Sequence, residues 1–546
     1  MIDLSENSAW WERFALIAML VVLLWMGPAN IWDKQVEHGY PYGFYAQDAF
    51  IFMSYQPYLA ESGSWSNLAP YLSRGYTDVI QSQPPVLEIL SVLLAQATGF
   101  GYYTTTYLIV MILVLLAVFC FYFLIRTFNP KVALLSLPLN VFLFSNVFIS
   151  AFTWGNWPFF AGSSMLVLFF WCLAKIKERW MPALGALAMA AVAFGHTSEY
   201  IFIVPILGFM FLVDVASRQF NWAEWKRIAG MSIGSVILAG YYLIIFFSTF
   251  FHGYEPQYMS PDVAGMSLFV KVTTPGVWLV LAVAVGLLIG LLMVKKHRVV
   301  QIGLMMFLIG FTNYIGTGKR GLETRYLWPI YLSIFAGLLI YAIGTKMIRQ
   351  YLTIRTCAIV SIVLTVLLAN HYYVETGGPG ILFREGWKGM EWVAKSTPEN
   401  ATILYVYGDA YGQAAILFNT QRISDVILVD DFVSMAQSGA LKRRVKTESL
   451  FDHTNALPYR KGLFDFGFHW TEDNVQARGE MDFCGFDYYA FDKVSRIQGA
   501  AQFNQVIASH LVQNANFTKA YENEGVIILK NPNPGGDCIA NSTVQH

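Results

Sequence analysis

A lone acid, Asp48, follows the first long apolar stretch of the chain and precedes an aromatic-rich segment that runs to Gly63. A carboxylate near a low-dielectric boundary binds its proton more tightly than one in water, which suits a general base. Asp48 is therefore a candidate base for deprotonating an acceptor group. Glu61 and Asp78 are weaker candidates in the same loop, and an ordinary solvated loop acid is the alternative reading.

A second candidate group is the run His196-Thr197-Ser198-Glu199, which follows the apolar stretch 181–195. A histidine and a carboxylate at a membrane boundary are costly to desolvate, so such groups usually have partners or a task. His196 would assist acid–base chemistry or bind phosphate, and Glu199 would supply a second acid. The alternative is a helix start, with Thr197 or Ser198 as the cap and Glu199 in the first turn.

A third group is cationic: Lys319, Arg320 and Arg325 precede Leu327-Trp328-Pro329. Arginine forks match phosphate oxygens well, so these side chains are predicted to bind a phosphate. Simple snorkelling of long cationic side chains at a membrane interface is the alternative.

The elements that must position these groups are membrane helices. The 546 residues are 56% hydrophobic and only 13% charged, which is typical of a polytopic membrane protein, and the net charge of zero indicates no nucleic-acid partner. A spanning helix needs about 20 apolar residues. The candidate spans are 14–31, 86–98, 105–125, 132–151, 159–174, 181–195, 200–216, 228–250, 277–294, 299–316, 327–345 and 356–370.

Lysine and arginine gather in four short loops, at 175–179, 218–227, 295–298 and 346–355. Placing these loops in the cytoplasm puts the C-terminal part outside the cell, with the protein in the plasma membrane. This orientation requires that the short segment 86–98 does not cross fully. The alternative is a full crossing at 86–98 and a split of 132–151 at Pro138.

The chain divides into a membrane domain, residues 1–370, and an external soluble α/β domain, residues 371–546. Aromatic residues fill the external loop 32–85, which predicts one or two interfacial helices there. In the C-terminal part, a helix is predicted at 385–396 and strands at 401–407, 423–428 and 526–529. Cys484 and Cys538 are the two cysteines of this domain, so they are predicted to form a disulfide. Three glycan acceptor patterns, at Asn400, Asn516 and Asn541, also fall on the external side.

The first loop, with Asp48, Gly63 and Gln83-Pro84-Pro85, resembles the N-terminal signature of the GT-C glycosyltransferases, which use lipid-phosphate sugars as donors. The resemblance implies a bundle of about 11–13 membrane helices with the active site on the external face. It implies Asp48 at the reaction centre, and Arg325, placed before an aromatic-Pro helix start, on the donor phosphate. Tyr45, Asp78, Asn156 and Tyr326 are predicted to line the same cavity.

The family often carries two adjacent acids where this chain has Gln47-Asp48. That departure argues against a metal site, so no ligands are assigned, although a divalent cation, Mg²⁺ or Mn²⁺, is the cofactor such chemistry would use. The predicted function is sugar transfer from a polyprenyl-phosphate donor to a glycan or protein acceptor. The alternatives are a transporter or flippase for a lipid-linked solute, and a non-catalytic assembly protein that keeps the fold.

Overall fold

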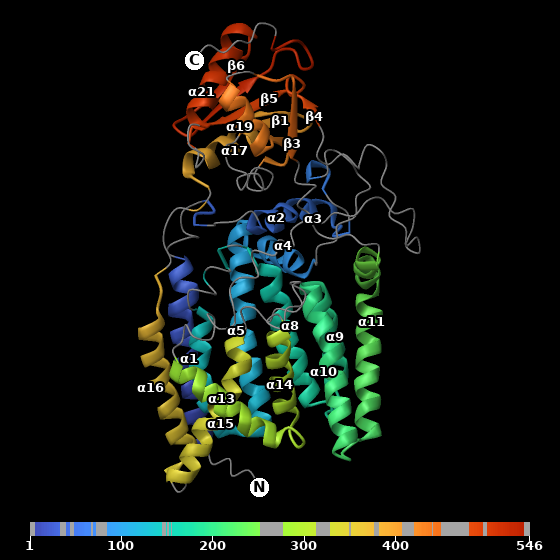
Figure 1. Ribbon diagram of the computed structural model, residues 1–546, viewed down its shortest axis with the longest axis vertical. Helices are drawn as coiled ribbons and strands as arrows, with labels where there is room; N and C mark the ends of the chain where they lie inside the picture. Colours follow the sequence, from blue (N-terminus) through green and yellow to red (C-terminus); the bar gives the residue numbers. More distant parts are fainter. Residues whose placement is uncertain are drawn as a thin grey trace.

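The computed structural model describes residues 6–32, 40–43, 48–66, 69–72, 85–144, 149, 152–153, 155–251, 277–312, 328–348, 351–375, 380, 382–406, 420–438, 441–448, 480–494 and 500–539. These residues form a helical bundle with a small sheet domain stacked on one of its ends (Figure 1). The predicted class, a helical membrane protein with a C-terminal α/β part, is confirmed.

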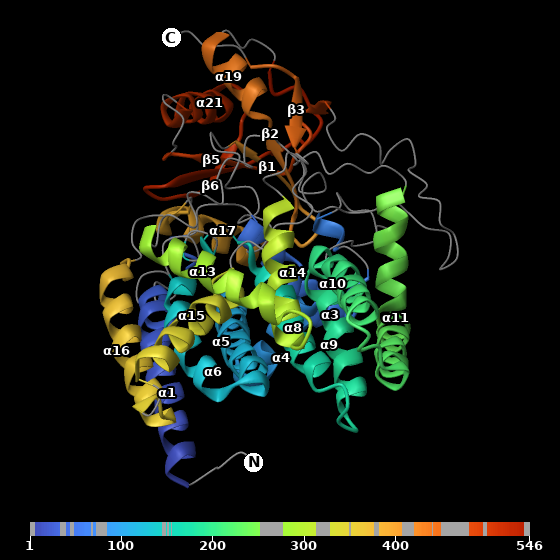
Figure 2. The same ribbon diagram turned by 60° about the horizontal axis from the view of Figure 1, so that its bottom comes forward.

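Within the described residues, seven segments are long and apolar enough to span a membrane. They lie in α1 (Glu6–Leu24, continued by the π-helix η1, Trp25–Ala29), α5 (Tyr102–Phe128), α8 (Trp157–Ala174), α10 (Thr197–Ala216), α11 (Trp222–Phe251), α15 (Trp328–Ile348) and α16 (Ile354–Tyr372). Shorter apolar helices complete the bundle: α4 (Val86–Thr98), α6 (Pro130–Ser136), α9 (Met181–Gly195), α13 (Val277–Met293) and α14 (Arg298–Thr312). Helices α1 and α16 pack together at one side of the bundle, and α11 lies at the other (Figures 1 and 2).

Two of the predicted membrane spans are not continuous α-helices long enough to cross a membrane. Helix α4 has 13 residues, which is about 20 Å of helix and shorter than the hydrocarbon core, and it lies at the end of the bundle near the sheet domain (Figure 1). The predicted span 132–151 changes from α-helix to 3₁₀-helix at Leu137, one residue before Pro138, and the 3₁₀ segment η4 runs over Leu137–Phe144. Proline lacks the N–H that an α-helix would need, which accounts for the change at this position.

The first loop supplies short helices that lie across the same end of the bundle, as its aromatic content predicted. They are α2 (Asp48–Ser54), α3 (Gln56–Ser62) and the 3₁₀ turn η3 (Pro70–Leu72). Gln56 fixes α3 to α5 by donating from Nε2 to Thr106 Oγ1 at 2.8 Å. The Tyr71 hydroxyl donates to the Ser54 carbonyl at 2.8 Å, and burial raises the pKa of Tyr71, so this hydroxyl stays a donor. Since η3 also contacts β2 of the sheet domain, the loop joins the two parts of the molecule.

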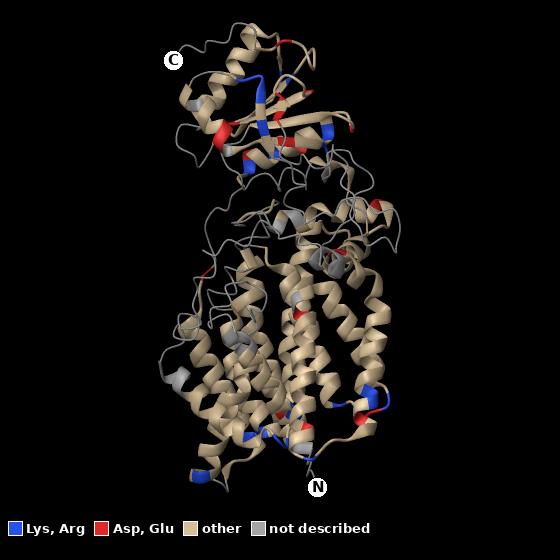
Figure 3. Cartoon of the chain, turned by 45° about the vertical axis from the view of Figure 1, so that its right-hand side comes forward, with Lys and Arg blue, Asp and Glu red and all other residues tan. Residues whose placement is uncertain are grey.

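At the opposite end of the bundle, Arg298 of α14 holds three helices together. Its guanidinium donates to both Asp214 oxygens at 2.7 and 2.6 Å and to Glu224 at 2.9 Å. Trp225 adds an indole N–H to the same Asp214 carboxylate at 2.9 Å. Figure 3 shows that the described Lys and Arg residues of the bundle lie at this end, away from the sheet domain.

The described strands of the C-terminal part form a seven-stranded mixed sheet in the order β4-β3-β2-β1-β5-β7-β6. The strands are β1 (Thr402–Val406), β2 (Ile423–Ile427), β3 (Arg444–Glu448), β4 (Glu480–Asp482), β5 (Tyr488–Asp492), β6 (Thr518–Glu522) and β7 (Val526–Lys530). Strand β1 pairs in parallel with β2 and β5, and the outer pairs are antiparallel. The predicted helix and three strands are confirmed; β3 to β6 were not predicted.

Alternate residues of the strands face two different cores. Ile403 of β1 packs with α17 (Arg384–Ser396) in the core that continues into the bundle. Leu404 packs on the opposite face with α19 (Val429–Ser438) and α21 (Ala500–Asn514). Because one core runs from the bundle into α17, the domain boundary at residue 370 stays a prediction.

The connection from the bundle to the sheet domain is fastened to α1. The Trp25 and Tyr373 rings stack with centroids 4.5 Å apart, and Asn30 Nδ2 donates to the Val374 carbonyl at 2.7 Å.

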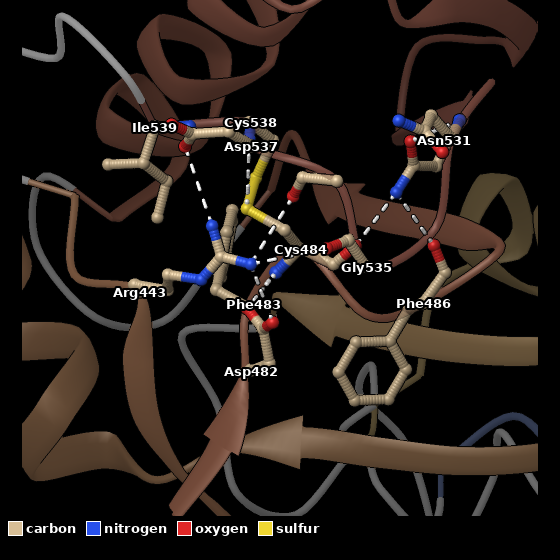
Figure 4. Close-up of a disulfide and its surroundings, with 12 residues drawn as sticks. Arg443, Asp482, Phe483, Cys484, Phe486, Asn531, Gly535, Asp537, Cys538 and Ile539 are labelled. Atoms are coloured by element: carbon tan, nitrogen blue, oxygen red, sulfur yellow. Dashed lines mark hydrogen bonds and ion pairs between the residues drawn. A yellow bond between two sulfur atoms is a disulfide. The ribbon is translucent and has the colours of Figure 1, made fainter.

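The predicted disulfide is present: Cys484 and Cys538 are bonded, with Cα atoms 5.6 Å apart (Figure 4). It ties the C-terminal segment to the turn between β4 and β5. Asn531 reinforces this turn by donating to the carbonyls of Cys484 and Phe486 at 3.0 and 3.1 Å. Cys120, Cys172 and Cys357 are buried free thiols.

The disulfide gives a stability prediction. The Cys484→Ala/Cys538→Ala variant removes a cross-link between positions 54 residues apart, which enlarges the conformational freedom of the unfolded sheet domain. We expect the domain to lose about 2–4 kcal/mol of unfolding free energy. Thermal unfolding of the purified protein measures it, with Cys120→Ala as the single-thiol control. An unchanged melting temperature in the double variant would contradict the prediction.

Candidate functional site

The candidate site forms where α9 ends and α10 begins, at the end of the bundle that faces the sheet domain. His196 is the N-cap of α10 and has extended backbone angles, φ −161° and ψ 118°. Two glycines bring α8 against this junction. A Cβ atom on Gly162 would lie 2.6 Å from the His196 Cβ, and one on Gly195 would lie 2.7 Å from the Gly162 nitrogen. The two backbones therefore touch, and this contact fixes where His196 begins α10.

His196 and Glu199 form a pair. The imidazole Nδ1 contacts the Glu199 carboxylate Oε2, one helical turn away. The His196 side chain is 34% exposed, whereas that of Glu199 is 1% exposed. A buried carboxylate on Nδ1 orients the ring, favours the tautomer that carries its lone pair on Nε2, and stabilises the imidazolium that forms when Nε2 takes a proton. The pair can therefore act as a general base.

The helix-cap alternative is wrong for Thr197. The cap position belongs to His196, and α10 has no side-chain cap hydrogen bond. The Thr197 hydroxyl instead bonds to the Tyr242 hydroxyl of α11 at 3.0 Å. Glu199 does lie in the first turn of α10, where the helix dipole favours its charge. This part of the helix-start alternative is therefore right, and it is compatible with the contact between Glu199 and His196.

Aromatic side chains from separate elements surround the pair. Phe159 of α8 presents an edge to the His196 ring with centroids 5.6 Å apart. From the first loop, Trp65 packs against Phe194 at 5.9 Å and Tyr241 at 5.4 Å. The loop that carries Asp48 therefore reaches the end of α9, two residues before His196.

The other predicted site residues are placed only in part. Asp48 begins α2 and thus lies on a helix instead of in a loop; its side chain lies outside the described residues. Asn156 is the N-cap of α8, with its carbonyl accepting from the Phe160 N–H at 3.4 Å, and its side chain caps no helical N–H. The remaining predicted residues, Tyr45, Asp78, Lys319, Arg320, Arg325 and Tyr326, lie outside the described residues.

Three buried polar side chains of the bundle were not among the predicted site residues. Glu88 lies in the first turn of α4 and Tyr331 in that of α15, while Tyr242 lies within α11. Glu88 could have been predicted as a candidate, because an acid within an apolar stretch such as 86–98 is unusual. Nothing in the sequence separates Tyr242 or Tyr331 from other tyrosines of the spans.

No group of three His, Cys, Asp or Glu side chains that could hold a metal ion occurs among the described residues. Glu199 and His196 offer two ligands, which is fewer than Mg²⁺ or Mn²⁺ takes from a protein carboxylate site without further partners. We therefore derive no step through a metal.

The close approach of α8 and α9 leads to a prediction. Gly162→Ala forces its new methyl group into the backbone of His196, so the two helices must separate, at a cost of about 1–3 kcal/mol. We expect a fall in any activity that depends on His196, together with a lower melting temperature. Gly208→Ala is the matched control, because no atom lies within 4 Å of a Cβ there. Equal behaviour of the two variants would contradict this account.

No family model and no curated protein matches the chain. Solved structures with the same fold include the oligosaccharyltransferase AglB from Archaeoglobus fulgidus, in complex with an inhibitory peptide and a dolichol-phosphate. The TM-score is 0.54 at 12% identity, over 77% of this chain and 65% of AglB, so the chain spans less than two thirds of that relative. A further AglB structure holds zinc and sulfate.

Two further similar structures are ArnT and AftD. ArnT from Cupriavidus metallidurans, bound to undecaprenyl phosphate, has a TM-score of 0.52 at 11% identity, over 96% of this chain and 99% of ArnT. The arabinofuranosyltransferase AftD from Mycobacteria has a TM-score of 0.55 at 13% identity, over 95% of this chain and 40% of AftD. At these identities the likeness concerns the fold alone. The chain has the fold of the GT-C glycosyltransferases, as its resemblance to them predicted.

Proposed function

We propose that this protein is a membrane glycosyltransferase that moves a sugar from a polyprenyl-phosphate donor to a glycan or protein acceptor. The observation that carries the proposal is the buried Glu199 carboxylate on the half-exposed His196 imidazole. This base lies at the end of the bundle where the first loop, with Asp48 at the start of α2, packs on the helices. The fold, shared with AglB and ArnT, supports the reaction class.

In the proposed reaction, an acceptor group attacks the anomeric carbon of the sugar. The bond from that carbon to the phosphate oxygen breaks, the bond to the acceptor forms, and the acceptor proton passes to Asp48 or to His196 Nε2. Polyprenyl phosphate leaves with the bonding electrons. Helices α8 and α10 begin toward this end, so their N-termini favour the phosphate charge, together with Lys319, Arg320 and Arg325.

We also propose that the site and the sheet domain face the outside of the cell. The bundle's described cations lie at the opposite end, which is the pattern of a cytoplasmic face (Figure 3). Two of the glycan acceptor asparagines, Asn400 and Asn516, are exposed on the sheet domain; Asn541 lies outside the described residues.

The test is a transfer assay on the purified chain in lipid nanodiscs. The protein is incubated with undecaprenyl phosphates that carry different hexoses and pentoses, and release of undecaprenyl phosphate is followed by mass spectrometry. We expect release from at least one donor, lost in His196→Ala. Movement of intact donor across liposomes without release would favour the transporter alternative, and neither release nor movement would favour the assembly protein.

Arg325 provides a separate prediction for donor binding. A bidentate guanidinium–phosphate pair is expected to contribute to the free energy of donor binding. Arg325→Ala should therefore weaken the binding of undecaprenyl phosphate by about tenfold or more. Arg325→Lys keeps the charge and loses the fork, so it should restore binding only in part. Arg355→Ala is the control, since this arginine lies over Trp11 near the start of α16. Equal binding by all three variants would remove Arg325 from the site.

A further inference from the structure

The turn between α21 and β6 holds one asparagine out into solvent. Helix α21 ends at Asn514, and Asn516 follows with a left-handed backbone, φ 58°. The amide N–H groups of Ala515 and Phe517 both donate to the Leu511 carbonyl, at 3.1 and 3.2 Å. Phe517 and Leu511 pack in the same buried core of the sheet domain, whereas Asn516 is exposed. The turn is therefore fixed by Phe517 and presents Asn516 on the surface.

Asparagine suits this position for two separate reasons. A left-handed residue after a helix is usually glycine, and asparagine is the side chain that tolerates this conformation next best. Asn516-Phe517-Thr518 also fits the acceptor pattern for an N-linked glycan, in which a hydroxyl follows two residues after the asparagine. Thr518 is the first residue of β6 and is exposed, so both recognised side chains of the pattern are accessible in the folded domain.

The pattern at Asn400 is only half accessible by comparison. Asn400 itself is exposed, but the Thr402 hydroxyl donates to Asp487 Oδ2 at 2.9 Å and accepts from the Asp487 N–H at 3.2 Å. The Thr402 N–H also donates to that carboxylate, at 2.8 Å. Thr402 begins β1, which pairs with β2 on one side and β5 on the other. Recognition of this hydroxyl would require the central strand to leave the sheet.

The position of Asn516 also gives a glycan something to protect. Strand β6 forms one edge of the described sheet, and most of its side chains are exposed. An exposed edge offers unpaired backbone groups to other chains, and proteins commonly cover such edges. A glycan is bulky and solubilising, so one attached two residues before β6 would shield this edge.

We propose that Asn516 carries an N-linked glycan on the folded sheet domain. The Asn516 amide nitrogen attacks the anomeric carbon of a lipid-linked oligosaccharide in the active site of an oligosaccharyltransferase of the same cell. The carbon–nitrogen bond forms, the bond from that carbon to the phosphate oxygen breaks, and the amide proton passes to a base of the transferase. The lipid phosphate leaves with the bonding electrons. The proposal rests on the proposed external location of the sheet domain and adds a modification site to it.

The experiment is glycopeptide mass spectrometry of the full chain, purified from the cells that naturally make it. The peptide that contains Asn516 should carry the mass of a glycan, and the peptide that contains Asn400 should not. Thr518→Ala should remove the glycan completely although Asn516 is still present, because it breaks the pattern. Thr518→Ser keeps the hydroxyl and should keep the glycan.

Asn516→Gly separates the acceptor from the backbone conformation. Glycine adopts a positive φ freely, so this variant should fold normally and lose the glycan. Asn514→Gln is the matched control, because Asn514 is an exposed asparagine outside the pattern, and it should keep the glycan. An unmodified Asn516 in the wild type, or a glycan that persists in Thr518→Ala, overturns the inference in favour of the purely conformational reason.

A second measurement tests the location of the domain by itself. Glu524→Cys introduces a thiol at an exposed position, and a membrane-impermeant maleimide is added to intact cells. The wild type is the blank, because its described cysteines are buried or bonded to each other. Labelling of intact cells with Asn516 unmodified would reject the glycan alone. Labelling only after the cells are opened would reject the external location and the glycan together.

Discussion

Glu199→Gln should slow sugar transfer by about 100-fold or more, the usual contribution of a positioned acid–base group. The amide keeps the shape of the side chain but removes the charge that stabilises the His196 imidazolium, and it can leave the ring in the wrong tautomer. The measurement is the rate of undecaprenyl phosphate release under single-turnover conditions, so that slow product release does not mask the chemical step. Donor binding should change little, because the pair acts on the acceptor proton.

The control for this variant is Glu224→Gln. Glu224 is also a carboxylate in the first turn of a helix, and it is paired with Arg298 at the far end of the bundle. Glu224→Gln should lower the melting temperature. The single-turnover rate of sugar transfer should not fall comparably. If Glu199→Gln transfers sugar at the wild-type rate, or if Glu224→Gln is equally slow, the pair is a structural element and the base must be sought elsewhere.

Asp48→Asn should reduce transfer by orders of magnitude, about 100- to 10,000-fold, while expression and folding persist. Asparagine keeps the size of the side chain and removes the carboxylate that the resemblance places at the reaction centre. An acid also favours the first turn of α2 through the helix dipole, so a small loss of stability, about 0.3–1 kcal/mol, is expected in addition. The assay is the same single-turnover release, with circular dichroism to follow the helices.

Glu61→Gln is the matched control for Asp48→Asn, because Glu61 is an exposed acid of α3 in the same loop. It should transfer at nearly the wild-type rate. The double variant Asp48→Asn/Glu199→Gln then separates two arrangements. If both acids serve one proton transfer, the second change adds little to the first; if they serve separate steps, their effects multiply. Full activity in Asp48→Asn would contradict the proposal that Asp48 takes part in the reaction.

The sequence predicted the membrane helices well, because spanning length and hydropathy are properties of a local stretch. Each apolar stretch is helical over its described residues, and α9 at 181–195 begins and ends where predicted. The sequence also singled out His196 and Glu199 as candidates, and the first turn of α10 brings their side chains into contact, since residues three apart on a helix lie on the same face. The disulfide followed from the placement of only two cysteines in one compartment.

The sheet was predicted less completely. Strand β5 lies between β1 and β7, yet its residue Tyr488 pairs with Ile403 of β1, 85 positions earlier in the sequence, and no local pattern reports such a pairing. Strand β6 shows mostly exposed positions, so it lacks the apolar run that identified β1.

The surroundings of the site depended on the tertiary structure. Phe159 of α8 packs on His196 and Tyr242 of α11 bonds the next residue, Thr197, although the helices that carry them are distant in sequence. Spacing along the chain could place Glu199 on His196, because one helix carries both. It could not place Phe159 or Tyr242 there, because the packing of the helices decides which side chains of an apolar bundle face one another. The glycine contact between α8 and α9 is the clearest example.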